Sequence, residues 1–188
     1  SRLNINPENL SVQDMENLYV EFNRKAESNP ILWEEANKWF LLLENKDPNA
    51  LRVWQILREK SLEEFDKVYR LLGIGFDRIT GESYYLKYKN QVLEDLKSLR
   101  NVRSSEGALI AEFEDLPPVV LLKSNLSTTY ALRDIMAIKG RVEETGCELI
   151  IYEVGAEQSV HFKQVFRLAS SLGYIREENL IHLPHGLY

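Results

Sequence analysis

The chain has 188 residues, and its 44% hydrophobic content is enough for one core, or for one core with an appended lobe. Charged residues make up 28% of the sequence and aromatic residues are plentiful, so a globally disordered chain is excluded. The formal net charge of −6 argues against strong nucleic-acid binding by this chain alone, although a local basic patch remains compatible with it.

Cysteine and histidine usage points to a reducing compartment and away from a metal site. The single Cys147 cannot form an internal disulfide, and it is interpreted as a packing residue. The sequence shows no secretory signal and no long apolar run, so a cytoplasmic location without a membrane is expected. His161, His182 and His185 lack the spacing of a metal site, and no metal is predicted.

Residues 1–73 are predicted to form a helical lobe. A capping residue precedes an apolar-periodic run at three places, which are Ser11, Asn29-Pro30 and Asp47-Pro48. We expect three antiparallel helices joined by short links. We also expect the Trp and Phe side chains of these helices to pack as the core of the lobe.

Residues 74–188 are predicted to form an α/β portion with an inserted hairpin. Two short apolar runs, 107–113 and 119–124, suit a hairpin-like pair of strands. The expected helices cover residues 84–99, 128–145 and 159–174, and further strands cover 148–155 and 179–185. The final strand, helix and strand have the spacing of a βαβ unit, which predicts a parallel sheet.

Ligands bind open parallel sheets beyond the carboxyl ends of the strands. One candidate loop follows the strand that ends at Gly155 and leads to Gln158. Another candidate is the loop before Tyr130, and both loops are expected at the same edge of one sheet. A third segment, "FDRITGES", exposes Glu82 after a turn at Gly81.

Four polar residues from these segments suggest a small pocket, namely Glu82, Tyr130, Asp134 and Gln158. Two carboxylates in one pocket repel each other unless a cation lies between them. A guanidinium group fits best, because it is planar, permanently charged and carries five donors in a fixed fork. The amide beside it can meet an α-amino or carboxylate group.

An ordinary alternative stays open at this point. Glu82 and Asp134 could pair with Arg78, Arg133 or Arg141 as surface ion pairs. Such pairs are common and cost little to form, so the pattern alone favours this interpretation.

The order of several motifs adds a resemblance that no single motif carries. The sequence contains "FDRITGES", then "TTYALRDI", then "YEVGAEQSVHFKQVF" and finally "HLPHGL". From about Leu18 to Leu187 the chain resembles the catalytic domain of arginyl-tRNA synthetase, a class I aminoacyl-tRNA synthetase. The resemblance implies part of a Rossmann-like nucleotide-binding domain, in which helices flank a parallel sheet, preceded by an α-helical lobe.

The resemblance also implies roles for individual residues. Glu82 and Asp134 would face the guanidinium of the substrate arginine, Tyr130 would pack and hydrogen-bond beside it, and Gln158 would meet the α-amino end. On the ATP side the resemblance places His161, His185 and Gly186. In the intact enzyme, ATP with Mg would be used to activate arginine for transfer to tRNA(Arg).

The chain departs from the family pattern in two respects. The HIGH and KMSKS signatures of class I synthetases are absent and would lie before residue 1 and after Tyr188. This chain alone is therefore expected to bind no cofactor firmly and to form no arginyl-adenylate. The family usually has "KSDGT" where this chain has "KSNLST", so that Asn125 and Leu126 replace Asp and Gly. Losing that glycine removes an easy left-handed backbone position.

Two further interpretations remain beside that of a synthetase segment. A stand-alone paralogue could keep the arginine pocket and act as an arginine-binding or protein-interaction module. The helical lobe could serve as a partner-binding surface, although the acidic balance gives tRNA contact little support. Self-association, or association with the missing half of the domain, is also expected, because half a sheet leaves an open edge and an apolar face.

Overall fold

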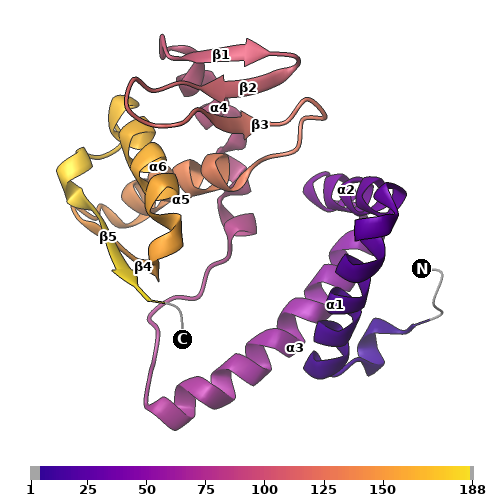
Figure 1. Cartoon of the computed structure of the whole chain (residues 1–188). Helices are drawn as coiled ribbons and strands as arrows, with labels where there is room; N and C mark the ends of the chain where they lie inside the picture. Colours follow the sequence, from indigo (N-terminus) through magenta and orange to yellow (C-terminus); the bar gives the residue numbers. More distant parts are fainter. Residues whose placement is uncertain (1–4, 187–188) are drawn as a thin grey trace. The chain divides into compact units, whose positions relative to one another are not determined.

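A computed structural model describes residues 5–186 and divides the chain into two compact units (Figure 1). The helical unit runs up to Arg78, and the α/β unit begins at Ile79. The boundary predicted from the sequence, after residue 73, falls at the end of the last long helix of the first unit. Residues 1–4 and 187–188, which the predicted domains include, lie outside the described range.

Capping side chains begin two of the helices in the helical unit. Its elements are η1 Pro7–Asn9, α1 Val12–Ser28, α2 Pro30–Glu44 and α3 Pro48–Leu72. Ser11 and Asp14 form a reciprocal capping box before α1, and Asp47 accepts two backbone N–H groups at the start of α3. The side chain of Asn29 makes no capping hydrogen bond at α2, so this detail of the prediction is wrong. There the fixed φ of Pro30 suits the first helical position.

The aromatic side chains of the helical unit do not form the expected core. Trp33 and Trp39 are 47% and 48% exposed, and Phe65 is also exposed. Among residues 5–78, the buried apolar side chains are those of Ala26 and Ala50. Figure 1 shows the second half of α3 continuing past α1, and apolar side chains there, such as Phe65 and Val68, are exposed. Periodicity placed these residues on common faces, but too few neighbours cover the faces.

Helices and strands alternate along the second unit, which confirms the predicted α/β class. Its elements in order are η2 Glu82–Tyr88, α4 Lys89–Lys97, β1 Val102–Ser105, β2 Ala108–Ala111, β3 Val119–Leu122, α5 Tyr130–Thr145, β4 Ile150–Gly155, η3 Ala156–Gln158, α6 Ser159–Ser171, η4 Glu177–Asn179 and β5 Leu180–His185. The segment predicted as one helix over 84–99 is a 3-10 helix followed by a shorter α-helix. Within the described part of the chain, no helix is both long and apolar enough to cross a membrane.

Strands β1, β2 and β3 form an antiparallel sheet in that order. The pairing of β2 with β3 confirms the predicted hairpin-like pair, while β1 is an addition that the sequence did not suggest. Because β3 pairs with β2 rather than with β4, the loops near Tyr130 and Gly155 do not end at one edge of a single sheet. That expectation is wrong, and the chain instead turns from β3 directly into α5.

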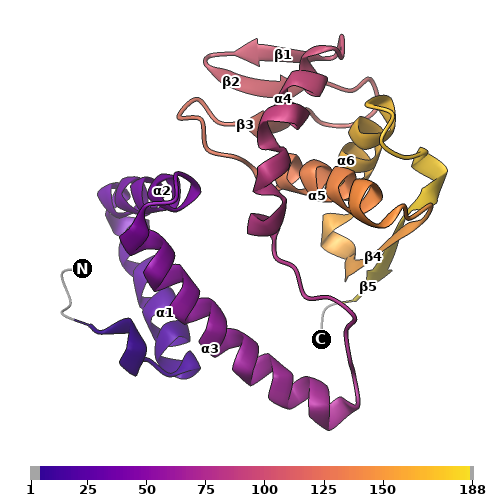
Figure 2. The same cartoon turned by 180° about the vertical axis from the view of Figure 1, so that it is seen from behind.

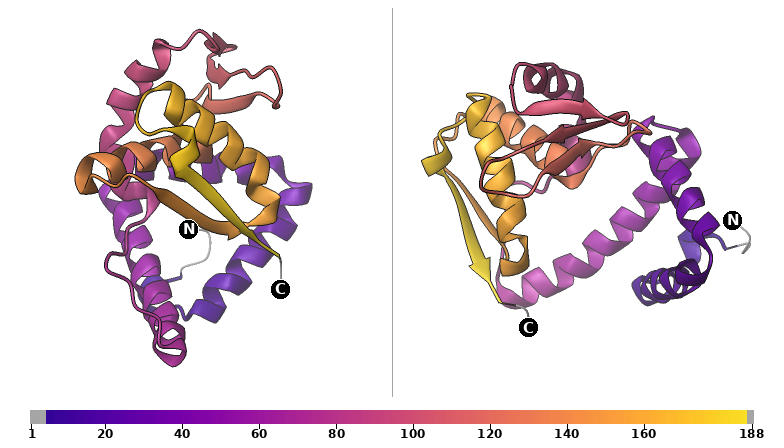
Figure 3. Two further views of the ribbon diagram at one scale, coloured as in Figure 1. Left: turned by 90° about the vertical axis from the view of Figure 1, so that its left-hand side faces the viewer. Right: turned by 45° about the horizontal axis from the view of Figure 1, so that its top comes forward.

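Strands β4 and β5 pair in parallel and confirm the predicted βαβ unit. Their register joins Ile150 to Leu180 at one end and Gly155 to His185 at the other. Figure 3 shows α6 running along one face of this strand pair. The other face carries exposed apolar side chains, among them Ile151.

Helix α5 holds the α/β unit together. It contacts η2, α4, β3 and α6, and most of its central residues are buried (Figures 1 and 2). Gly140 permits the close approach of η2, because a Cβ there would lie 2.5 Å from Tyr85 Cδ1 and 2.6 Å from Tyr88 Cε2. The core thus fixes the direction in which the first turn of α5 projects.

Candidate functional site

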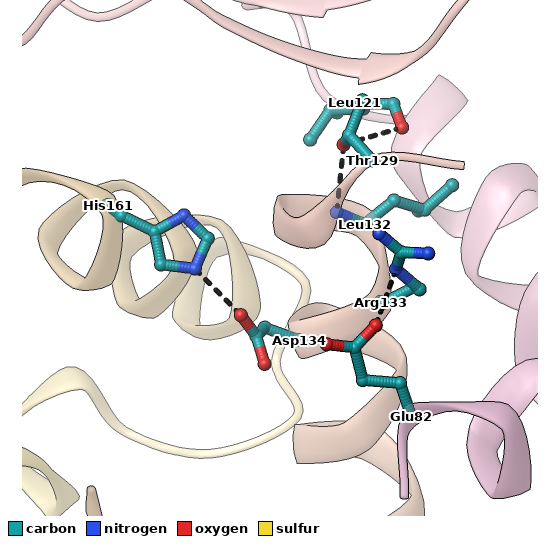
Figure 4. Close-up of polar contacts among 7 residues, drawn as sticks. All are labelled: Glu82, Leu121, Thr129, Leu132, Arg133, Asp134 and His161. Atoms are coloured by element: carbon teal, nitrogen blue, oxygen red, sulfur yellow. Dashed lines mark hydrogen bonds and ion pairs between the residues drawn. The ribbon is translucent and has the colours of Figure 1, made fainter. Parts of the chain in front are cut away.

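The first turn of α5 is anchored to strand β3 by Thr129. Its hydroxyl donates to the carbonyl of Leu121 at 2.9 Å and accepts from the backbone N–H of Leu132 at 3.4 Å (Figure 4). The backbone N–H of Thr129 also donates to Leu121, at 3.2 Å. Thr129 is thus an N-cap tied to the neighbouring sheet, which fixes the start of the helix that carries Tyr130 and Asp134.

The turn before this helix keeps a left-handed residue even though no glycine is present. Leu126 has φ +67° and is 64% exposed. Its N–H donates to Lys123 at 2.8 Å, and Asn125 Oδ1 accepts from the backbone N–H and the hydroxyl of Ser127 at 3.1 and 2.7 Å. Leu126 therefore adopts the left-handed conformation that a glycine would adopt easily, at the cost of an unfavourable φ for leucine.

The guanidinium of Arg133 lies between two of the residues proposed to hold a substrate guanidinium. Its Nε is 2.8 Å from Glu82 Oε2, and its Cζ lies 4.6 Å from the centre of the Tyr130 ring. The Arg133 side chain is 12% exposed, whereas Glu82 is 49% exposed and Tyr130 69%. Of the alternatives that the sequence left open for Glu82, the ion pair with Arg133 is present in the structure.

Asp134 points to the other side of α5, toward α6 (Figure 4). His161 Nε2 lies 2.7 Å from Asp134 Oδ2, and the ring N–H donates because a carboxylate accepts. The imidazole also meets the Phe162 ring edge to face, with centroids 5.1 Å apart. Both side chains are about a quarter exposed, so the contact lies partly open to solvent.

Gln158 ends the short helix η3, directly before α6. Its segment leaves the sheet at Gly155, where an added Cβ would lie 2.3 Å from the Glu157 carboxylate. Strand pairing puts Gly155 beside His185, so η3, His185 and the following Gly186 gather at the carboxyl edge of the parallel strands.

The structure therefore brings the predicted residues together in pairs rather than as one ring. Glu82 and Tyr130 meet through Arg133, while Asp134 meets the first turn of α6, close in sequence to Gln158. The contact between His161 and Asp134 is not predicted by the sequence, whose resemblance to the family places His161 on the ATP side.

Arg141, a third possible partner for the carboxylates, lies elsewhere. Its Nη1 donates to the Tyr152 hydroxyl at 2.6 Å, and its guanidinium stacks near the rings of Tyr85 and Tyr152. Burial raises the pKa of Tyr152 well above its ordinary value, more than the nearby Arg141 lowers it. This cluster supports the core and leaves Asp134 to other partners.

A second polar cluster ties α4 to α5 and to the turn after α6. Lys139 is buried, with Nζ 2.8 Å from Glu143 Oε1 and 3.7 Å from Asp95 Oδ2. The hydroxyl of Tyr174 donates to Asp95 Oδ2 at 2.5 Å, and the Lys139 ammonium lies over its ring. Burial, followed by the hydrogen bond to Asp95, raises the pKa of Tyr174.

The histidines of "HLPH" serve local structure. The ring of His182 donates to the carbonyl of Val154 at 3.0 Å, and His185 donates to the carbonyl of Gly186 at 2.9 Å. Among residues 5–186, no group of three or more His, Cys, Asp or Glu side chains is placed to hold a metal ion. Cys147 packs, partly buried, against the core.

Comparison with known proteins identifies the class to which this fold and site belong. The family model described as "tRNA synthetases class I (R), catalytic domain" matches residues 4–188, and the chain belongs to this family. Strand β4, helix α6 and strand β5 are thus part of the Rossmann-like domain that the sequence predicted.

The similar proteins within this class are arginine–tRNA ligases. Arginine–tRNA ligases of Exiguobacterium sibiricum and Halothermothrix orenii are 39% and 40% identical over 178 and 172 residues, which is 94% and 90% of this chain. The crystal structure of arginyl-tRNA synthetase from Plasmodium falciparum matches with a TM-score of 0.70 and 30% identity, over 83% of this chain and 29% of that one. The alignments cover 32% and 30% of the two ligases, so the chain spans about a third of their length.

Proposed function

We propose that this chain forms the arginine-binding segment of an arginyl-tRNA synthetase. In the intact enzyme the segment would serve ATP-dependent activation of arginine and its transfer to tRNA(Arg). Asp134 would face the guanidinium of the substrate together with Glu82, Tyr130 would hydrogen-bond beside it, and Gln158 would meet the α-amino end.

One observation carries the proposal, which is the position of Asp134. Its carboxylate is held at 2.7 Å by His161 in the first turn of α6, the helix that Gln158 precedes. The carboxylate and the amide thus come from two elements that meet beyond a parallel strand end, where ligands of such sheets bind. A carboxylate that is mostly buried but still about a quarter exposed is suited to a guanidinium.

The chemistry asked of this segment is binding and orientation. The substrate carboxylate attacks the α-phosphate of ATP, and pyrophosphate leaves, so no covalent bond to the protein forms. Holding both ends of arginine places the carboxylate for in-line attack. Stabilising the phosphate charge is the task of the HIGH and KMSKS segments. Mg accompanies ATP in that reaction, but residues 5–186 offer no cluster suited to a resident metal, and no step is assigned to it.

We propose that this chain alone forms no arginyl-adenylate, because the two phosphate-binding signatures are absent from its sequence. Purified chain, arginine, ATP and labelled pyrophosphate are expected to show exchange no faster than a reaction without protein. Exchange at the rate of an active synthetase, abolished by removing arginine, would refute the inactivity.

The alternative function is an arginine-binding module that works without the rest of a synthetase. Calorimetric titration distinguishes the two by affinity, since a module should bind arginine tightly and reject lysine, which lacks the fork of donors, whereas a segment of the pocket should bind arginine weakly. Asp134→Asn is expected to weaken arginine binding at least about tenfold, the scale of one charge-assisted hydrogen bond. Asp115→Asn is the matched control, because Asp115 pairs with Arg167 on the surface. Equal binding by the Asp134 variant and the wild type would remove Asp134 from the site.

A further inference from the structure

The chain supplies a guanidinium of its own to part of the proposed substrate site. Arg133 Nε is 2.8 Å from Glu82 Oε2 (Figure 4). The Cζ atom of the Arg133 guanidinium lies 4.6 Å from the centre of the Tyr130 ring. A carboxylate and a phenol ring are the two groups that the site would otherwise offer to the side chain of free arginine. Arg133 therefore makes contacts of the kind expected from the substrate.

Helix geometry explains how Arg133 reaches this position. Tyr130 and Arg133 are three residues apart and lie on the same face of α5, so the guanidinium and the ring are neighbours on the helix surface. Glu82 is the first residue of η2, which packs against α5. Asp134 is turned toward α6 and is paired with His161, so Arg133 engages one of the two carboxylates and leaves the other for a ligand.

The charges also match this division. Glu82 and Asp134 together carry two negative charges, and Arg133 neutralises one of them in the pair with Glu82. A site with one remaining carboxylate suits the single positive charge of an arginine side chain. Glu82 becomes available to a ligand when the Arg133 guanidinium moves away from it.

We propose that Arg133 is an internal competitor for the substrate guanidinium and thereby sets the affinity of the site for arginine. This inference rests on the proposed arginine site. In the ligand-free chain the Arg133–Glu82 pair closes part of the site, and arginine binds first at Asp134. The apparent dissociation constant is raised by the fraction of molecules in which the pair is closed.

Arginine titrations of a double-mutant cycle test the proposal. Arg133→Gln removes the competing charge, and Glu82→Gln removes the carboxylate for which the two guanidinium groups compete. Arg133→Gln is expected to tighten arginine binding by up to about fivefold, the population shift produced by one partly exposed ion pair. In the Glu82→Gln background the same change should have no effect, because no carboxylate is left to release.

Two further variants serve as controls for the effect of Arg133→Gln. Arg103→Gln breaks an ion pair of similar length with Glu112 on the antiparallel sheet, and it should leave arginine binding unchanged. Arg133→Lys keeps the charge but loses the planar fork, and it should give an intermediate gain, also usable if Arg133→Gln fails to fold. Circular dichroism of each variant reports folding.

The outcomes separate the two proposals. One outcome is that the wild type binds arginine, that Asp134→Asn weakens this binding, and that both Arg133 variants bind arginine no tighter than the wild type. In that case Arg133 is a structural partner of Glu82 and the inference is refuted. The arginine site itself would then stand. If neither the wild type nor any variant binds arginine at millimolar concentration, the arginine site is refuted and the role of Arg133 falls with it.

Discussion

The left-handed Leu126 gives a stability prediction whose sign is opposite to the usual one. A protein with alanine at a position inside a helix is normally more stable than the same protein with glycine there, by about 1 kcal/mol. At φ +67° the order should reverse, because the Cβ of any L-residue crowds its own backbone there. The comparison of Leu126→Gly with Leu126→Ala isolates this effect, since both variants remove the exposed leucine side chain and differ in the Cβ alone.

The magnitude follows from two opposing terms. The left-handed conformation costs an L-residue about 1–2 kcal/mol, which glycine avoids. Glycine in turn gives up about 0.4–1 kcal/mol through the greater freedom of its unfolded chain. Leu126→Gly is therefore expected to be about 0.8 kcal/mol more stable than Leu126→Ala. With a slope typical of a small unit, the urea midpoints should differ by about 0.5 M.

Urea unfolding followed by circular dichroism measures this difference. The control pair is Lys163→Gly and Lys163→Ala at an exposed position inside helix α6, where the alanine variant should be the more stable by about 1 kcal/mol. All three tryptophans lie in the helical unit, so tryptophan emission follows that unit separately. A Leu126→Ala variant as stable as Leu126→Gly, with the control pair behaving as expected, would show that φ at Leu126 imposes no strain.

Two other predictions concern the core of the α/β unit. Gly140→Ala should destabilise the unit by about 1–2 kcal/mol in urea unfolding, because overpacking against Tyr85 and Tyr88 outweighs the gain in helix propensity; an unchanged midpoint would contradict the close approach. Burial, and then the hydrogen bond to Asp95, raises the pKa of Tyr174, so folding favours the neutral form of this side chain. The free energy of unfolding should therefore fall as the pH rises above about 10, where the tyrosine of the unfolded chain ionises. Tyr174→Phe should lower the free energy of unfolding at pH 7 by about 1 kcal/mol, because the hydrogen bond to Asp95 is lost. The same variant should lose less of its stability above pH 10 than the wild type does. An equally steep loss in the variant would exclude Tyr174 as its source.

The sequence predicted the strongly periodic elements well but missed one strand. Strand β1 reads "VRSS" and has no apolar alternation, so the sequence carries no periodic signal for it, although its backbone pairs with β2 over four residues. The connecting turn uses Glu106 and Gly107, both with positive φ, as a two-residue hairpin requires. Because glutamate stands where asparagine or aspartate usually marks such a turn, the signal was not recognised.

Burial in the helical unit could not be predicted from periodicity either. An apolar stripe shows which side chains share a face, as for Trp33 and Phe65, but not whether another element covers that face. At the candidate site, helical spacing put Tyr130 and Asp134 on one face of α5, but Asp134 turns toward His161 of α6 while Tyr130 lies beside Arg133. Which carboxylate meets Arg133 depends on how η2 approaches α5, and this is a matter of tertiary packing.

The two parallel strands show how a sheet can be aligned when its apolar pattern does not decide the alignment. Apolar residues occur on both faces, since Ile150 is buried while Ile151 is exposed, so sliding one strand by a residue would still bury an isoleucine. Directional bonds supply the missing information. Arg141 donates to the hydroxyl of Tyr152 and holds β4 to α5, while the bond from His182 to the carbonyl of Val154 joins the two strands and does not survive a slip. Replacing Tyr152 and His182 by leucine would thus remove the contacts that fix the strand register while the strands stay apolar. The expected product is a mixture of molecules in which β4 and β5 pair in different registers.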